Sequence, residues 1–217
     1  MKKKTVALLL ALVLVVGVVA GGTIAWLVDK TGTVTNTFTV GDVNVELTET
    51  GIDNKGEKSF QLIPGTSYAK DPKVTIKANS VDCYLFVRFD EVNSPKDYLD
   101  YTSTLTAPGW TQLTGVKDTQ GKEVNVWYRE VSSNTRDQSW DLLSQLDDKG
   151  NTVKVKTTVV KHGTDTTDTD NVAMPAAENQ PQLVYKAAAV QKDNLTVSAA
   201  WNQVAADMGC GTIAIIG

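Results

Sequence analysis

Histidine and cysteine are nearly absent from this 217-residue chain, which contains one histidine, His162, and two cysteines. A zinc protease of the H-E-x-x-H type needs two imidazoles on one helix face, and a serine or cysteine triad needs a histidine base. His162 stands beside Gly163 in a polar, loop-like stretch, where a solvated surface side chain is the simpler interpretation. The sequence therefore provides no catalytic constellation, and we expect a protein that is not an enzyme.

Dense carboxylate clusters are also lacking, apart from one loop-like stretch with Asp165, Asp168 and Asp170. An EF-hand calcium loop would need a glycine at its sharp turn and a closing glutamate, which this spacing does not supply. We interpret the cluster as a solvated acidic loop, and we expect neither a metal site nor a cofactor.

No charged residue occurs between Lys4 and Asp29. Lys2–Lys4 followed by the 24 uncharged residues Thr5–Val28 have the layout of an export signal, with a basic n-region and an apolar h-region. The same stretch is long enough to span a bilayer, so an uncleaved N-terminal anchor is the alternative. Small residues permit cleavage after Ala20 or after Ala25, with Thr23 two residues before the latter.

Basic charge is scarce in the rest of the chain. The formal net charge is -4, and removing residues 1–25, which carry three lysines and no acid, takes it to -7. A domain this acidic would approach phosphates against its own field, so we expect no nucleic-acid partner. Contact with a membrane is expected only through the uncleaved signal.

Long helical periodicity is missing, whereas β-prone runs follow one another along the chain. Val43, Val45 and Leu47 share one parity after Gly41-Asp42, and Pro64-Gly65 has the chemistry of a turn. This order predicts a single domain built as an antiparallel sandwich or barrel. The further runs expected to form strands cover residues 73–78, 83–92, 123–131, 151–160, 182–190 and 195–201.

Helical signals occur at only two places. Residues 139–148 could form a short helix or an extended arm, and residues 202–209 could form a final turn or two. Polar, turn-rich stretches predict long surface loops at residues 93–109, 115–122 and 161–181.

The two cysteines, Cys83 and Cys210, permit one disulfide in an exported chain. Cys83 shares its strand parity with Leu85 and Val87, so a buried free thiol that packs as a small hydrophobe is the alternative.

Three segments, taken together and in order, resemble the TasA/camelysin family of bacterial extracellular matrix proteins. They are "GGTIAWLVDK" with "NTFTVGDVNVEL", then "IPGTSYAKDPKVTIKANSVDCYLFVRF", and finally "LVYKAAAVQKDNLTVSAAWNQV". With the signal, these segments extend over residues 1 to about 204. The two cysteines and the apolar tail "CGTIAIIG" depart from the family pattern, so the tail could pack on the domain or lie exposed.

The resemblance implies a signal peptide, residues 1–25, that a SipW-type signal peptidase cuts between Ala25 and Trp26. It also implies that residues 26–217 form a two-sheet, antiparallel, jelly-roll-like sandwich with long loops, preceded before cleavage by an N-terminal signal helix. Such a protein would be secreted to the extracellular matrix or cell surface and would self-associate into fibres, with other matrix proteins as further partners. Camelysin relatives are sometimes catalogued as metallopeptidases, for which this sequence offers no metal ligands.

The arm at residues 26–40 is apolar and β-prone, and its N-terminus is blocked until the signal is removed. An isolated strand gains little by itself, while the open edge of a sandwich is a template for an added strand. We therefore expect donor-strand complementation, in which the arm of one subunit completes a sheet of the next. The alternative is an arm that folds back into its own subunit and gives a stable monomer. The side chains expected to enter the acceptor are those of Trp26, Val28, Val34 and Phe38.

A monomeric adhesin or carbohydrate-binding module is the alternative function, since jelly-roll folds often bind sugars. Exposed aromatic residues would support it, and Trp110, Trp127 and Trp140 are the candidates. Trp127 alternates out of phase with Val126 and Tyr128, which predicts that it faces outward. Packing in a core or an interface is the competing interpretation for each of the three.

Overall fold

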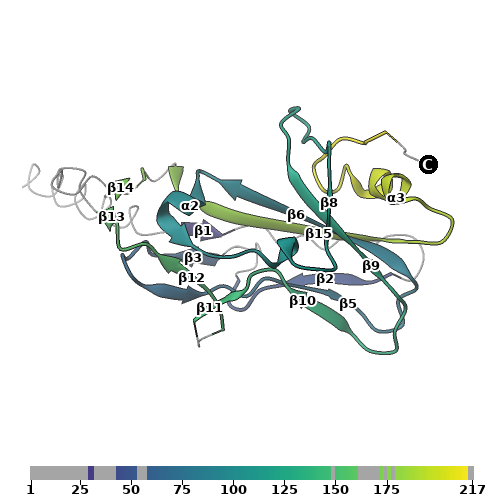
Figure 1. The fold of residues 1–217 in the computed structure, drawn as a ribbon, viewed down its shortest axis with the longest axis horizontal. Coiled ribbons are helices and arrows are strands. Elements are labelled where there is room, and N and C mark those ends of the chain that lie inside the picture. Colours follow the sequence, from purple (N-terminus) through teal and green to yellow (C-terminus); the bar gives the residue numbers. More distant parts are fainter. Residues whose placement is uncertain are drawn as a thin grey trace, which may run out of the picture.

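The computed structural model describes residues 29–31, 43–52, 58–147, 150–160, 172–173, 175–176 and 179–214. This part of the chain is predominantly β, and its larger sheets are antiparallel (Figure 1). The predicted all-β, antiparallel class is therefore confirmed. None of the helices in these ranges is long and apolar enough to cross a membrane.

One layer is a four-stranded antiparallel sheet in the order β15-β6-β9-β8. Its strands are β15 (Gln182–Gln191), β6 (Cys83–Val92), β9 (Asn125–Val131) and β8 (Thr111–Leu113). All ten residues of β6 pair with β15, and seven of them also pair with β9. A central strand buried on both faces needs a continuous apolar run, and "CYLFV" at the start of β6 supplies it.

The facing layer consists of shorter strands. A three-stranded sheet has the order β10-β5-β2, made of β10 (Gln138–Asp141), β5 (Lys73–Ile76) and β2 (Val45–Thr48). Beside it, β12 (Gly150–Val155) pairs with β11 (Gln145–Asp147), β4 (Ser67–Ala69) and β7 (Leu99–Asp100). Three residues, 70–72, separate β4 from β5, so the chain passes directly from one sheet to the other.

An apolar core fills the space between the two layers. Alternate residues of β6 supply Cys83, Leu85, Val87 and Phe89, and the predicted face of β2 is confirmed, because its apolar side chains are buried here. Strand β15 of the same sheet adds Leu183, Tyr185, Ala187 and Ala189. The facing strands and their connections contribute Val43, Val45, Leu47, Val74, Ile76, Leu142, Leu143 and Val153.

A second core covers the outer face of the four-stranded sheet. Helix α3 (Val197–Val204) and the chain after it lie on this face (Figure 1). Thr196 caps the helix, because its side chain accepts a hydrogen bond from the backbone N–H of Ala199. Trp201 is fully buried and meets Phe86 of β6 edge-on, with ring centroids 5.4 Å apart.

The remaining elements are short. Strand β1 (Asp29–Thr31) pairs antiparallel with β3 (Lys58–Phe60), and β13 (Val159–Val160) pairs parallel with β14 (Val172–Ala173). The segment between β6 and β8 holds α2 (Pro95–Tyr98) and a 3₁₀ turn, η1 (Thr104–Thr106). A small third cluster lies where β7 pairs with the end of β12, and its buried members are Leu62, Leu99, Val155 and Val159.

Two sequence-based assignments are corrected. Residues 195–201, expected to be a strand, belong largely to α3, because Ala200, Trp201 and Val204 recur at helical spacing against the sheet. Of residues 139–148, residues 139–141 belong to β10 and residues 145–147 to β11, so the arm interpretation is correct and the helix is not; Asp148 lies outside the described residues. The expected turn at Pro64-Gly65 is present, with Gly65 at φ 75°.

Candidate functional site

The N-terminal arm was the first functional segment expected from the sequence, and the structure describes three of its residues, Asp29–Thr31. These form β1, which lies beside β15 and pairs with β3 so that Lys30 stands opposite Ser59. Among the described strands, β3 is the one partner of β1. The cleavage residues Ala25 and Trp26 and the donor residues Val28, Val34 and Phe38 lie outside the described ranges.

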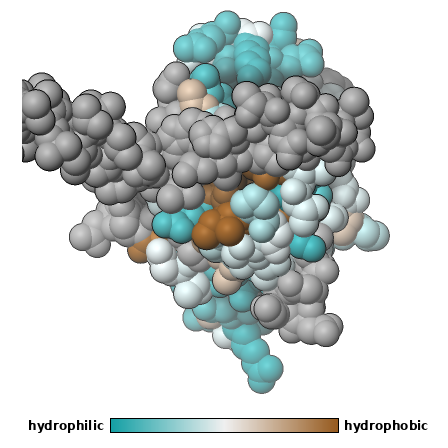
Figure 2. Space-filling view, turned by 90° about the vertical axis from the view of Figure 1, so that its left-hand side faces the viewer, coloured by the Kyte–Doolittle hydropathy of each residue, from teal (hydrophilic) through white to brown (hydrophobic). Residues whose placement is uncertain are grey.

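The end of the molecule near β1 and β3 also carries exposed apolar surface. Figure 2 views the end where α2, β13 and β14 lie in Figure 1, and apolar atoms are visible there among polar ones. The loop between β3 and β4 belongs to this end, because the N–H of Gly65 bonds to the carbonyl of Val155. Ile63 in this loop is 43% exposed, the most of any large hydrophobic side chain described.

Different edge strands lie along the two long sides of the sandwich. On one side β15 lies beside β2. On the other side, β8 and β10 end their sheets among the described strands. Here the guanidinium of Arg129 lies 5.2 Å from the ring centroid of Trp110 and 4.9 Å from that of Trp140, and this cation–π stack joins β9 to β10.

Burial lowers the pKa of Arg129 within this stack. Gly109 gives the guanidinium its room, because a Cβ at this position would lie 2.1 Å from Nη2 of Arg129, and its φ is +93°. Trp110 and Trp140 are therefore packing residues at the interface between the layers.

The strand pattern predicted that Trp127 faces outward, and this prediction is wrong. Trp127 packs against the core between the layers and is half-buried, whereas Val126 and Tyr128 point to the α3 side. The prediction assumed one buried face, and helix α3 makes both faces of this sheet apolar.

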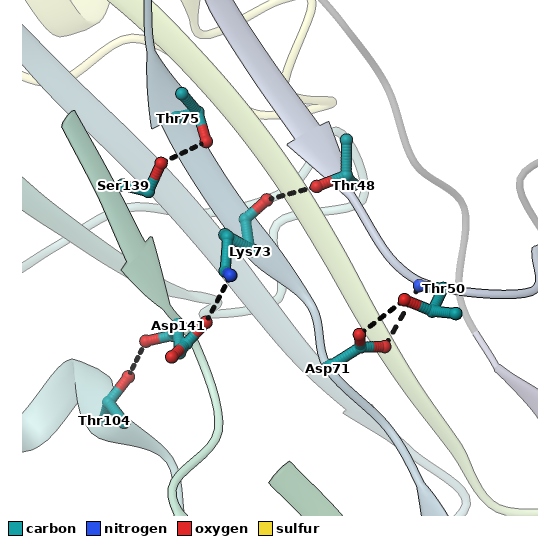
Figure 3. Close-up of polar contacts among 8 residues, drawn as sticks. All are labelled: Thr48, Thr50, Asp71, Lys73, Thr75, Thr104, Ser139 and Asp141. Atoms are coloured by element: carbon teal, nitrogen blue, oxygen red, sulfur yellow. Dashed lines mark hydrogen bonds and ion pairs between the residues drawn. The ribbon is translucent and has the colours of Figure 1, made fainter. Parts of the chain in front are cut away.

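Polar side chains cover the outer face of the β10-β5-β2 sheet (Figure 3). The hydroxyls of Thr75 and Ser139 are 2.8 Å apart, and Lys73 forms an ion pair with Asp141 at 3.4 Å. The hydroxyl of Thr104 donates to the carbonyl of Asp141, which fixes the loop at η1 against the end of β10. Lys73, Asp141 and Ser139 are exposed on this face, whereas Thr75, on the central strand, is 6% exposed.

Both cysteines are free and buried. Cys83 faces the core between the layers, whereas Cys210 belongs to the core under α3, on the other face of the same sheet. The disulfide is therefore not formed, and the alternative of a buried thiol is correct for both residues. Burial raises the pKa of Cys83 to about 12 and also raises that of Cys210.

The described part of the C-terminal tail, which extends to Ala214, packs on the domain without a disulfide. Nη1 of Arg88 donates to the carbonyls of Met208 and Gly209 at 2.9 and 3.0 Å. Its Nε lies 2.6 Å from Asp90 without hydrogen-bond alignment, so that contact is an ion pair. Asn202 of α3 exchanges two hydrogen bonds with the backbone of Ile213.

A buried ion pair crosses the core near the β4–β5 junction. Nζ of Lys70 lies 3.0 Å from Glu49, and the two side chains are 1% and 5% exposed. The ring of Tyr185 stands 5.9 Å from the same Nζ. The hydroxyl of Tyr185 is buried without a hydrogen-bond partner, and burial raises its pKa well above the ordinary value.

Metal and histidine chemistry receive no support from the described ranges. No group of three or more histidine, cysteine, aspartate or glutamate side chains in them could hold a metal ion. His162, Asp165, Asp168 and Asp170 lie outside these ranges.

A groove of about 320 Å³ opens where β6 and β9 diverge from residues 101–106. Trp127 lines it together with Phe89, Tyr101, Glu91 and Asn125. Of these, the sequence singled out Trp127 alone, since no local pattern shows that residue 91 meets residue 101 across a turn.

Comparisons with protein-family models, with curated proteins and with solved structures found no match to this chain.

Proposed function

We propose that this chain is a secreted structural subunit of extracellular or biofilm matrix fibres, assembled head-to-tail by donor-strand complementation. The described domain would be a jelly-roll-like sandwich, and export with removal of residues 1–25 by a SipW-type peptidase would release Trp26 as the first mature residue. A head-to-tail contact of this kind does not close on itself, so it propagates as a filament.

The observation that carries the proposal is the pairing of β1. Three residues of the arm pair with the three-residue strand β3, and neither strand belongs to the two larger sheets that enclose the main core. A two-stranded pair of this length is marginally stable by itself, so exchanging it for a partner in another subunit costs little.

Exposed apolar side chains and open sheet edges also support self-association. Ile63, in the loop that follows β3, is exposed at the same end as β1, and Val81, 36% exposed, lies in the turn that follows β5. Among the described strands, β8 and β10 end their sheets on one long side, and the unpaired backbone groups of such an edge are a template for an added strand.

A reversible lock on the arm tests the proposal. The variant Lys30→Cys/Ser59→Cys places two thiols directly opposite each other on β1 and β3. We expect the oxidised, locked monomer of the mature chain to remain monomeric in sedimentation and to show no fibres by negative-stain microscopy. Reduction should restore assembly.

The matched control locks a pair that does not involve the arm. Thr75 and Ser139 face each other on β5 and β10, so Thr75→Cys/Ser139→Cys adds a comparable cross-link between two strands of one sheet, away from the arm. This variant should assemble in both redox states. Equal assembly of the locked and the reduced arm variant would overturn the donor-strand proposal, as would fibre formation by a folded chain that lacks residues 26–33.

A further inference from the structure

The groove beside Trp127 has the composition of a ligand site. Its volume of about 320 Å³ is within the range of small-molecule pockets. Aromatic walls come from Phe89, Tyr101 and the half-buried Trp127, and polar groups come from Glu91 and Asn125 at the ends of β6 and β9. Such a mixture of apolar faces and a few directed polar groups fixes the orientation of a small ligand.

Its aromatic wall is held rigidly. The ring of Phe89 stacks on buried Tyr185 with centroids 4.7 Å apart and an angle of 11°. Tyr101 meets Phe89 edge-on at 6.5 Å, and its hydroxyl donates to Oε1 of Glu91. Burial raises the pKa of Tyr101, so this hydroxyl stays protonated and keeps the Glu91 carboxylate in place.

Two of the lining residues keep one acceptor and one donor that bond to no other described residue. Oε1 of Glu91 also contacts Nζ of Lys96 at 3.2 Å, whereas Oε2 has no protein partner within the described ranges. Oδ1 of Asn125 accepts from Gln112 at 3.4 Å, which leaves the Nδ2 donor for a ligand. Neighbouring hydroxyls of a sugar both donate and accept, so they match this pair of groups.

The charge of the groove favours an uncharged ligand. Lys96 balances the carboxylate of Glu91, and Asn125 and Trp127 add no charge. A uronate or a phosphate would have to compete with Glu91 for Lys96.

We propose that this groove binds a neutral saccharide, whose C–H face packs on Trp127 while its hydroxyls bond to Glu91 and Asn125. The site is independent of the arm, so a fibre could carry one saccharide site on each subunit. The inference does not rest on fibre assembly.

Nuclear magnetic resonance on the monomeric mature chain tests the site. Millimolar maltose, cellobiose, lactose and mannobiose are the neutral probes, and glucuronate and inorganic phosphate are the charged ones. We expect at least one neutral disaccharide to shift the indole N–H signal of Trp127, assigned through the Trp127→Phe variant, and the charged probes to leave it unchanged.

Variants separate binding from folding. In Glu91→Gln an N–H₂ group replaces the free carboxylate acceptor, and in Asn125→Ala the donor is removed. Each variant should weaken binding about tenfold or more, while its thermal unfolding temperature changes little. Trp110→Phe, in the cation–π stack outside the groove, is the control and should bind like the parent. Absence of a shift with every neutral probe, equal binding by all variants, or a stronger response to phosphate or glucuronate would overturn the proposal.

Discussion

The two layers of the sandwich differ in what lies on their outer faces. The four-stranded sheet is covered outside by α3 and the C-terminal tail, which bury Phe86, Trp201 and Cys210. The outer face of the β10-β5-β2 sheet carries the hydroxyl contact between Thr75 and Ser139 and the exposed ion pair between Lys73 and Asp141 (Figure 3). The four-stranded sheet is therefore the middle one of three layers, whereas the β10-β5-β2 sheet is an outer layer.

The sequences of the strands account for this difference between the two sheets. In β6, Cys83, Leu85 and Val87 alternate with Tyr84 and Phe86, so both parities are apolar. In β2, apolar Val45 and Leu47 alternate with Glu46 and Thr48, as expected for a strand with one solvated face. A strand with a continuous apolar run therefore packs against apolar layers on both faces, whereas a strand with alternating apolar residues packs against one.

Removing the largest side chain of the outer core should give the largest effect. Trp201→Ala deletes a fully buried ring that packs against Phe86, and we expect a loss of about 3–5 kcal/mol in the free energy of unfolding. Chemical denaturation followed by circular dichroism measures it. A loss below about 1 kcal/mol, which is the size of a typical surface effect, would mean that α3 is not part of the folded core.

Detaching the tail should cost less. Arg88→Met removes the two hydrogen bonds to the carbonyls of Met208 and Gly209, so we expect a loss of about 1.5–3 kcal/mol. Arg136→Met, at an exposed arginine in the β9–β10 turn, is the matched control and should change stability little. Equal effects of the two variants would show that the tail contributes nothing to the stability of the sheet.

The sequence alone predicts β6 at residues 83–92 because a long β-prone run lies between Asp82 and Asn93. It misassigns residues 195–201, since Leu195 and Val197 imitate strand alternation, whereas the cap at Thr196 and the packing of Trp201 make the segment helical. The packing depends on Phe86, more than a hundred residues away in the chain, which no local pattern contains.

The same limit applies to the candidate groove. Trp127 was identified as a candidate from its phase, yet that phase places it toward the inner core rather than outward. Glu91, Tyr101 and Asn125 meet only because β6 and β9 pair and the chain turns back after α2. A single sequence gives strand phase, but it does not show which distant loop closes over a strand end.

Removing an unpaired hydroxyl from the inner core should stabilise the protein slightly. Tyr185→Phe keeps the stack on Phe89 and deletes the buried hydroxyl, so we expect a gain of about 1 kcal/mol at neutral pH. The gain should grow above pH 10, the ordinary pKa of tyrosine, because the unfolded parent then loses a proton that the folded parent retains. Urea unfolding at neutral and alkaline pH measures both effects. Tyr98→Phe, at a half-buried tyrosine, is the control, and an identical pH dependence for both variants would contradict the role of Tyr185.

The smallest effect is expected on the solvated face of the β10-β5-β2 sheet. Lys73 and Asp141 are 3.4 Å apart, but each side chain is 47% exposed, so water already screens the pair. Lys73→Ala should therefore change the free energy of unfolding by no more than about 0.5 kcal/mol, and added salt should remove most of that change. Urea titrations of the parent and the variant at low and high salt provide the measurement. A loss of several kcal/mol that persists at high salt would show that this face is covered in solution, as it would be if a second copy of the chain packed on it, and the contrast between the two layers would then fail.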